Sequence, residues 1–260
     1  MRLAVGLSLA LCLASLAPAQ NQTVSDQQAL TLAAQAITAM TGGIAVTDIT
    51  VSGNATWIAG SDYETGTATL LAKGTTESRV VLNLGSGTRT EIRNALSGFT
   101  QGKWLNPNGA SGLMAWHNCQ TDVAWFFPVL SSLANLSNPV FIFSYVGQES
   151  WNGLPAYHLT ISQRPPANSK AALPVQALTA MDFYLDSGSL LPLAVDFNAH
   201  PDTDMNSNIP MEIRFASYQV INGIRIPFHI QRLINGGLSV DLVFTSAAIN
   251  SGLSDSQFSF

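Results

Sequence analysis

The sequence predicts an α+β fold, in which a large curved antiparallel sheet of about 10–11 strands forms an unclosed β-barrel. Two helical segments are expected to cover its concave apolar face. Apolar and polar residues alternate through most of the chain, and Gly or Asn separates the β-rich runs. Only two stretches show helical features. Because a flat sheet of ten strands is wider than two helices, the sheet must curl around them.

The first residues are typical of a secretory signal peptide. Arg2 precedes an apolar run over residues 3–16, and an Ala-Pro-Ala cleavage site follows. The apolar run is too short to span a bilayer. We therefore expect residues 1–19 to be removed and residues 20–260 to form a single exported domain, periplasmic or secreted.

Composition narrows the function classes. The chain has 16 Asp and Glu against 11 Lys and Arg, a net charge of −5. This acidic balance argues against a surface for nucleic acid or anionic membrane. Cys12 lies in the signal core, where Leu11 precedes it and a lipoprotein signal would need a small residue. Cys119 then remains without a disulfide partner, and we interpret it as a small buried hydrophobe rather than a reactive thiol.

The first structural element is expected to be a helix over residues 25–41. Ser25 is a plausible N-cap, Gln28 completes a capping-box pattern, and Gly42 ends the helix. The residues at helical spacing are Leu30, Ala33, Ala34, Ile37 and Met40 or Thr41. Their small side chains predict close packing against a sheet.

A meander is expected next. Five short β-rich runs follow one another without an intervening helical pattern, which argues against parallel crossovers. These runs cover residues 43–60, 62–74, 77–87, 88–95 and 99–109.

The second helical segment is expected within residues 117–139. Asn118 or Thr121 can cap it, and Pro128 must either kink it or begin a second helical piece. The aromatic triple at 125–127 lies at this break, and at least one of its rings is expected to project from the shared apolar face. The triple is either ordinary core or a lid over an apolar opening.

Further strands follow this segment. Hairpins are expected at Asn152-Gly153 and around residues 186–188, with a Pro-, Ala- and Ser-rich loop at 165–177. Asn222-Gly223 and the turn at 235–237 separate the last three strands. Pro227 indicates an edge, a bulge or a position without a ladder hydrogen bond.

The stretch from Met211 to Phe244 predicts a wall that is apolar on one face and polar on the other. The apolar face carries Met211, Ile213, Phe215, Ile224, Ile226, Phe228, Ile230, Leu238, Val240, Leu242 and Phe244. The polar face carries Glu212, Arg214, Arg225, His229, Gln231, Ser239 and Asp241. The apolar face must be covered, and the covered space is either solid or an apolar cavity.

Three C-terminal phrases carry a family resemblance: DFYLDSGSLLPLAVDF, MEIRFASYQVINGIRIPFHI and SGLSDSQFSF. With the order of signal peptide, helix, meander, central helices and closing strands, they resemble the periplasmic lipoprotein-carrier-like (LolA/LolB-like) superfamily. The resemblance implies an unclosed barrel that is lined with apolar residues, lidded by helices and able to hold acyl chains. The long loop at 165–177 departs from the carriers' pattern.

Motifs of catalysis and cofactor binding are absent from the sequence, including G-x-S-x-G, H-E-x-x-H, a P-loop and C-x-x-C. We expect no enzyme, no cofactor and no metal. His158 and His229 are expected to face outward. Asp202, Asp204, Asn206 and Asn208 have calcium-loop spacing, but Ser207 replaces the required Gly, so we interpret a polar turn and leave weak calcium binding open.

These observations predict a protein that binds or carries a hydrophobic or acyl ligand, a lipid or a lipoprotein acyl chain. Envelope lipoproteins or membrane proteins are candidate partners, and nucleic acid is not. The predicted ligand-binding residues are Trp125, Phe126, Phe127, Ile213, Phe215, Ile226, Phe228, Ile230, Val240, Leu242 and Phe244. The alternative is an envelope structural or interaction module with the same fold, a filled core and no ligand.

Overall fold

The computed structural model of the protein describes residues 24–121, 123–165 and 172–260. The predicted signal peptide therefore lies outside the described residues, as does most of the first half of the predicted loop at 165–177. Within these described ranges, no helix has the length and apolar character needed to cross a membrane.

The described residues form one antiparallel sheet of thirteen strands, two or three more than the 10–11 expected. The strands are β1 (Asp48–Ala59), β2 (Asp62–Lys73), β3 (Glu77–Leu84), β4 (Gly87–Asn94), β5 (Gln101–Leu105), β6 (Ser111–Leu113), β7 (Phe141–Trp151), β8 (Leu154–Gln163), β9 (Met181–Asp186), β10 (Pro192–Ala199), β11 (Ile209–Ile221), β12 (Ile224–Ile234) and β13 (Gly237–Ile249). The expected number was too low partly because β6 has three residues, too few to show an alternation.

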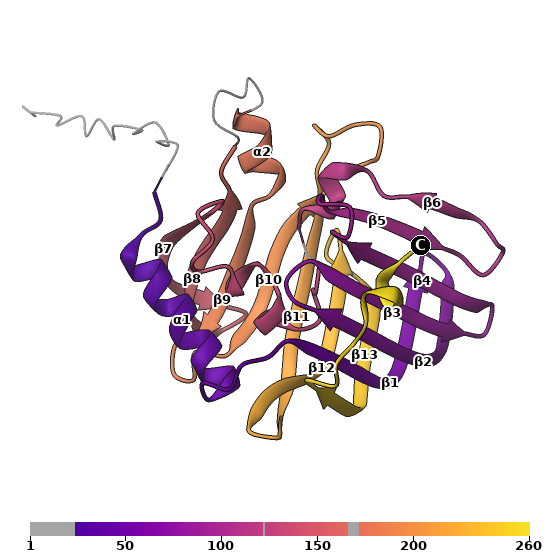
Figure 1. Cartoon of the computed structure of the whole chain (residues 1–260), viewed down its shortest axis with the longest axis horizontal. Coiled ribbons are helices and arrows are strands. Elements are labelled where there is room, and N and C mark those ends of the chain that lie inside the picture. Colours follow the sequence, from indigo (N-terminus) through magenta and orange to yellow (C-terminus); the bar gives the residue numbers. More distant parts are fainter. Residues whose placement is uncertain (1–23, 122, 166–171) are drawn as a thin grey trace, which may run out of the picture.

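The sheet consists of two meanders, β1–β6 and β7–β13, that join where β1 pairs with β13 (Figure 1). Within the described residues β6 and β7 are the two edges of the sheet and do not pair with each other. The sheet is therefore unclosed, as predicted. The β1–β13 pairing brings the N-terminal and C-terminal strands together at the middle of the strand order.

The described part of the chain contains two α-helices, α1 (Gln27–Thr41) and α2 (Ala172–Leu178). Short 3-10 segments lie at Trp116–Cys119, Pro128–Leu130, Ser132–Ala134 and Asp255–Phe258. The expected second helix within 117–139 was therefore wrong as to type, because this stretch forms only 3-10 segments and turns where it is described. Pro128, which lacks an N–H, begins one of them, as the alternative reading of this break predicted.

The start of α1 differs from the predicted capping box. Its N-cap is Asp26 and not Ser25, and Asp26 makes no side-chain cap hydrogen bond. The Ser25 hydroxyl instead accepts a hydrogen bond from Phe143 N at 3.1 Å, and the Asp26 carboxylate accepts one from Tyr145 N at 2.9 Å. Both side chains thus bind the helix to β7. Gly42 ends the helix with φ 60°, as predicted.

The buried face of α1 consists of other residues than the predicted face. Its buried residues are Ala29, Leu32, Ala33, Ala36, Met40 and Thr41, whereas Leu30, Ala34 and Ile37 are partly exposed. Three alanines on this face let the helix approach closely, and it packs against β7, β12 and the 3-10 segments at 128–134.

The predicted turns are confirmed. Asn152, Asn222 and Asn235 each have φ near 50° and each precedes a glycine with positive φ, as type I′ hairpins require. Pro227 lies beyond His229, where the paired register between β12 and β13 ends. The missing N–H of Pro227 therefore costs no ladder hydrogen bond on that side.

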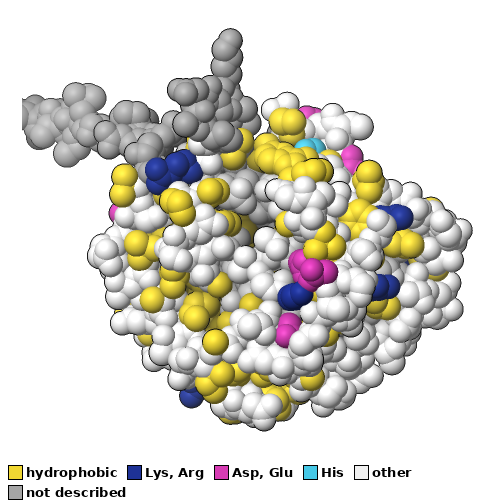
Figure 2. Space-filling model, in the orientation of Figure 1, with side chains coloured by type: hydrophobic (Ala, Val, Ile, Leu, Met, Phe, Trp, Pro, Cys, Tyr) yellow, Lys and Arg dark blue, Asp and Glu magenta, His cyan; other side chains and the backbone are white. Residues whose placement is uncertain are grey.

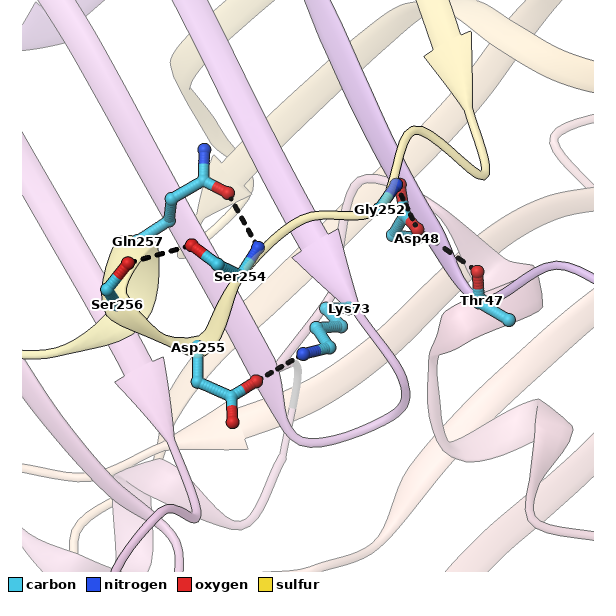
Figure 3. Close-up of polar contacts among 8 residues, drawn as sticks. All are labelled: Thr47, Asp48, Lys73, Gly252, Ser254, Asp255, Ser256 and Gln257. Atoms are coloured by element: carbon cyan, nitrogen blue, oxygen red, sulfur yellow. Dashed lines mark hydrogen bonds and ion pairs between the residues drawn. The ribbon is translucent and has the colours of Figure 1, made fainter.

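The C-terminal segment after β13 returns across the first strands of the sheet (Figure 3). Asp48 accepts hydrogen bonds from Thr47 and from Gly252 N, and Lys73 forms an ion pair with Asp255. Phe258 is fully buried, and its carbonyl accepts a hydrogen bond from the Asn94 side chain at 2.7 Å. This segment therefore fastens the outer side of β2–β4 rather than covering the concave face.

Candidate functional site

The concave face of the sheet has two unlike parts. In the first, which we call the packed half, α1 and residues 124–134, the plug segment, cover the inward side chains of β7–β9 and β11–β13. Phe126 and Phe127 are at most 1% exposed and belong to the same core cluster as the sheet residues beneath them. The packed half is a core of buried apolar side chains.

All eleven predicted ligand-binding residues belong to this buried core cluster. Nine of them line neither of the two cavities described below: Phe126, Phe127, Ile213, Phe215, Ile226, Phe228, Ile230, Leu242 and Phe244. The inward orientation predicted from the period of two is therefore confirmed for β11–β13. The prediction that one ring of the aromatic triple projects outward was wrong, because Trp125, Phe126 and Phe127 are all buried.

The second part, the open half, surrounds two adjoining cavities at β4, β5 and the nearby ends of β10–β12. The larger has a volume of about 350 Å³, and the smaller about 90 Å³. Glu91, Trp104 and Arg232 line both. The larger cavity is lined by the apolar side chains of Trp104, Met114, Phe197, Ile209, Met211 and Ile234. The two remaining predicted residues, Trp125 and Val240, line the smaller one.

Charged side chains line the open half from two distant strands. Arg89, Glu91 and Arg93 alternate along β4, so all three face the concave side. On β12, Arg232 continues the inward series of Ile226, Phe228 and Ile230. Its Nη1 lies 3.5 Å from Glu91 Oε1, and Arg93 Nη1 lies 3.7 Å from Glu91 Oε2.

Glu91 stays ionised between these two arginines. Burial acts to raise the pKa of Glu91, but the Arg232 and Arg93 guanidiniums outweigh it and hold the pKa below its ordinary value. One carboxylate thus bridges two guanidiniums across the curved sheet. This bridge connects β4 to β12, although the four strands β3, β2, β1 and β13 lie between them in the strand order.

Aromatic rings support the arginines. The Arg89 guanidinium lies 3.8 Å from the ring centre of Trp57, and that of Arg232 lies 5.2 Å from the ring centre of Trp125. Trp125 therefore connects the plug segment to the charged cluster. Figure 2 shows scattered charged side chains on one face of the molecule. Only 10% of the residues are charged, yet four of them, Arg89, Glu91, Arg93 and Arg232, gather around the two adjoining cavities.

The sequence prediction missed Arg89, Glu91, Arg93, Trp104 and Arg232. The signal for Arg232 was present, since it lies two residues beyond Ile230 in the inward series. The run TRTEIRN places three charged residues at a period of two, which is also the pattern of a solvated strand face. Alternation along a strand does not by itself distinguish a charged cluster on the concave face from a strand face in contact with solvent.

The other candidate sites do not assemble. His158 and His229 face outward, as predicted, and contact Asp182 and Asp241 at 3.0 and 2.7 Å. Asp202 accepts a hydrogen bond from Ala115 N, whereas Asp204 accepts one from Asn206 N within its own turn. Among the described residues, no group of three or more His, Cys, Asp or Glu is placed to hold a metal ion.

Cys119 is fully buried, as predicted. Burial raises the pKa of its thiol, which keeps the sulfur protonated and unreactive at neutral pH.

Comparisons with known proteins identify the fold. No protein-family profile matches the sequence, and no curated protein sequence matches it. Among solved structures, a LolA superfamily protein from Nitrosomonas europaea is 13% identical, with a TM-score of 0.57 over 89% of this chain and 97% of that one. An outer membrane lipoprotein-sorting protein domain from Vibrio parahaemolyticus is 13% identical, with a TM-score of 0.56 over 89% and 96%.

A DUF1329 family protein from Desulfovibrio piger is also similar, at 12% identity, with a TM-score of 0.56 over 91% of this chain and 98% of that one. These matches span nearly the whole of each chain, and they show that the protein has the LolA/LolB-like fold. The resemblance inferred from the C-terminal phrases is confirmed at the level of fold.

Proposed function

We propose that the protein is an exported, non-enzymatic binding protein or carrier for a lipid or a lipoprotein acyl chain. In this proposal residues 20–260 act as one binding domain in the periplasm or outside the cell. The observation that carries it is the pair of adjoining cavities in the open half. The larger one has the size of a small-molecule site and a wall of aromatic and aliphatic side chains.

The structural neighbours support the same class of function. One is described as an outer membrane lipoprotein-sorting protein domain and another as a LolA superfamily protein. At 13% identity they support the class of ligand without specifying which lipid is bound.

The predicted residues of the packed half would contact a ligand only after a movement of the plug segment. Phe126 and Phe127 lie between α1 and the sheet, so an acyl chain reaches Phe215 or Phe244 only if the plug segment moves aside. Trp125 and Val240 already line the smaller cavity, so a ligand bound there would contact them without movement of the plug segment.

A neutral fluorescent probe, N-phenyl-1-naphthylamine, tests the proposal directly. We expect its emission to rise when residues 20–260 are added, and unlabelled acyl chains to displace it. Ala199→Phe, which fills the larger cavity, should weaken binding by about tenfold or more. Ala216→Phe, an exposed position on β11, is the matched control and should bind as the parent does.

A second candidate is an envelope interaction module with a filled core. The solid packed half favours it, because most of the predicted lining residues are covered. Native mass spectrometry of the protein, purified without detergent, separates the two. Failure to bind the neutral probe, together with a mass free of any lipid adduct, would favour the interaction module.

A further inference from the structure

Four buried N–H donors in the open half have no hydrogen-bond partner. They are Nε of Arg89, Arg93 and Arg232 and Nε1 of Trp125. Trp125 is 2% exposed and Arg93 is 9% exposed, so bulk water does not surround them. Buried donors are normally paired, because an unpaired one loses its hydration without compensation. Their gathering around one pair of cavities therefore indicates an acceptor that is supplied from outside the chain.

The charges of the cluster indicate the kind of acceptor. Glu91 is shared by Arg93 and Arg232 at 3.7 and 3.5 Å, which leaves two guanidiniums with one carboxylate. Arg89 lies 4.0 Å from Glu64, and its Nη1 donates to Asn106 Oδ1 at 3.2 Å. Asp202 is exposed at the rim of the larger cavity. Arg93 and Arg232 therefore share one carboxylate, and the oxyanion of a ligand would supply these guanidiniums with a second acceptor.

The two cavities suit the two ends of an amphiphilic ligand, one polar and one apolar. The smaller cavity has Arg89, Glu91, Arg232 and Trp125 in its wall. The larger one continues from it along Phe197, Met211 and Ile234, which form an apolar floor. A head group in the smaller cavity would place an attached chain along this floor.

We infer that the open half recognises a single-chain anionic amphiphile, whose carboxylate or phosphate head accepts hydrogen bonds from Arg89, Arg232 and Trp125. This inference rests on the proposed function and specifies its ligand. Glu91, which also pairs with Arg93, holds Arg232 in place and competes with the ligand head for the same guanidinium. Trp125 belongs to the plug segment, so the bound head also connects that segment to the sheet.

The first experiment compares ligands with the same chain and different heads. Displacement of N-phenyl-1-naphthylamine is measured with dodecanoate, dodecyl phosphate, methyl dodecanoate and dodecanol, each below its micelle concentration. We expect at least one anion to bind about tenfold or more tightly than both neutral compounds. The anion that binds more tightly shows whether the head is a carboxylate or a phosphate, and high salt should reduce the preference.

Two variants with opposite expected effects test the residues. Arg232→Gln should lower the affinity for the anion about tenfold and leave that for dodecanol unchanged. Glu91→Gln removes the competing carboxylate and should raise the affinity for the anion. Arg214→Gln is the matched control, because this arginine pairs with Glu212 on the outer face. Arg232→Lys, which keeps the charge, covers the case in which Arg232→Gln does not fold, and it should retain part of the preference.

The outcomes separate this inference from the proposed function. If no amphiphile displaces the probe and the probe itself does not bind, the proposed function fails. If anionic and neutral compounds bind equally in the parent protein, or if Arg232→Gln keeps the full anion preference, the protein binds lipid chains and the inference about the head is wrong.

Discussion

The packed half and the open half belong to one sheet, yet their inward side chains have opposite characters. In the packed half, inward residues such as Phe215 and Ile230 are apolar, and the plug segment covers them completely. In the open half, Arg89, Glu91 and Arg232 occupy the same inward positions and line a cavity, with Trp125 of the plug segment beside them. The fold alone therefore does not determine where a ligand can enter.

The difference has a physical cause. Burial of apolar inward side chains beneath another apolar segment stabilises the folded state. The packed half is therefore covered by other segments of the same chain. Guanidiniums and a carboxylate lose hydration under such a cover unless their hydrogen bonds are met. An open half lined with arginines thus leaves space for a ligand that can meet those hydrogen bonds.

The largest expected effect comes from emptying the packed half. Phe126→Ala should lower the free energy of unfolding by about 3–5 kcal/mol, because it leaves a cavity in a solid core. Urea denaturation of the parent and the variant measures this change. Probe binding, measured where the variant is still folded, should change little. A small loss of stability with a large loss of binding would instead support the lid role for the plug segment.

The sequence predicted the packed half better than the open half. The period of two in β11–β13 and the Asn-Gly turns sufficed to place Ile213, Phe228 and Leu242 inward, since both signals are local. The same signals do not show which segment covers a face. The position of Arg232 beside Glu91 depends on the curvature of the whole sheet, which brings together residues far apart in the chain.

The helices show a similar limit. Ser25 and Gln28 have the spacing of a capping box, but Ser25 and Asp26 bind β7 instead, a tertiary contact that no local pattern reveals. In residues 117–139 the possible caps Asn118 and Thr121 suggested a helix, whereas Pro128 and the need to bury three consecutive aromatic rings favour short turns. This stretch lacks a helical repeat of apolar residues, and that absence indicated the observed structure better than the possible caps did.

The second largest effect should come from the outer face behind the packed half, where the Oδ1 atom of Asp196 is buried without a hydrogen-bond partner. Burial, with Glu212 and Asp182 beside it, raises the pKa of Asp196 to about 7. Because a raised carboxyl pKa destabilises the folded state as pH rises from about 4 to 7, Asp196→Asn should add about 2 kcal/mol at pH 8. At pH 4 we expect no gain. Urea denaturation at both pH values measures this, and an equal gain at both would refute it.

A smaller effect of opposite sign is expected for Glu91 in the open half. Its pKa is lowered by Arg232 and Arg93, so its contribution to stability is present above about pH 4.5 and is lost as pH falls further. Glu91→Gln should therefore cost about 1 kcal/mol at pH 7 and nearly nothing at pH 3, since the contacts are long and Glu91 is 29% exposed.

The control for this variant is the double variant Glu91→Gln with Arg232→Gln. If the carboxylate stabilises the fold through Arg232, removal of both should cost less than the two single changes added together. Additive costs would mean that Glu91 and Arg232 act separately and that the contact between β4 and β12 contributes little.

The smallest effect on stability should come from Trp104, together with a large effect on binding. Trp104 lies half-buried on β5, near the edge of the sheet, and its ring packs over Gly112. Trp104→Ala should cost less than about 1 kcal/mol of unfolding free energy and weaken N-phenyl-1-naphthylamine binding about tenfold, because the ring lines both cavities. Trp151→Ala, on the outer face beside Tyr184, is the matched control and should leave probe affinity unchanged. Together with Phe126→Ala, this pair assigns stability to the packed half and binding to the open half. A Trp104→Ala protein that bound the probe normally would break that division.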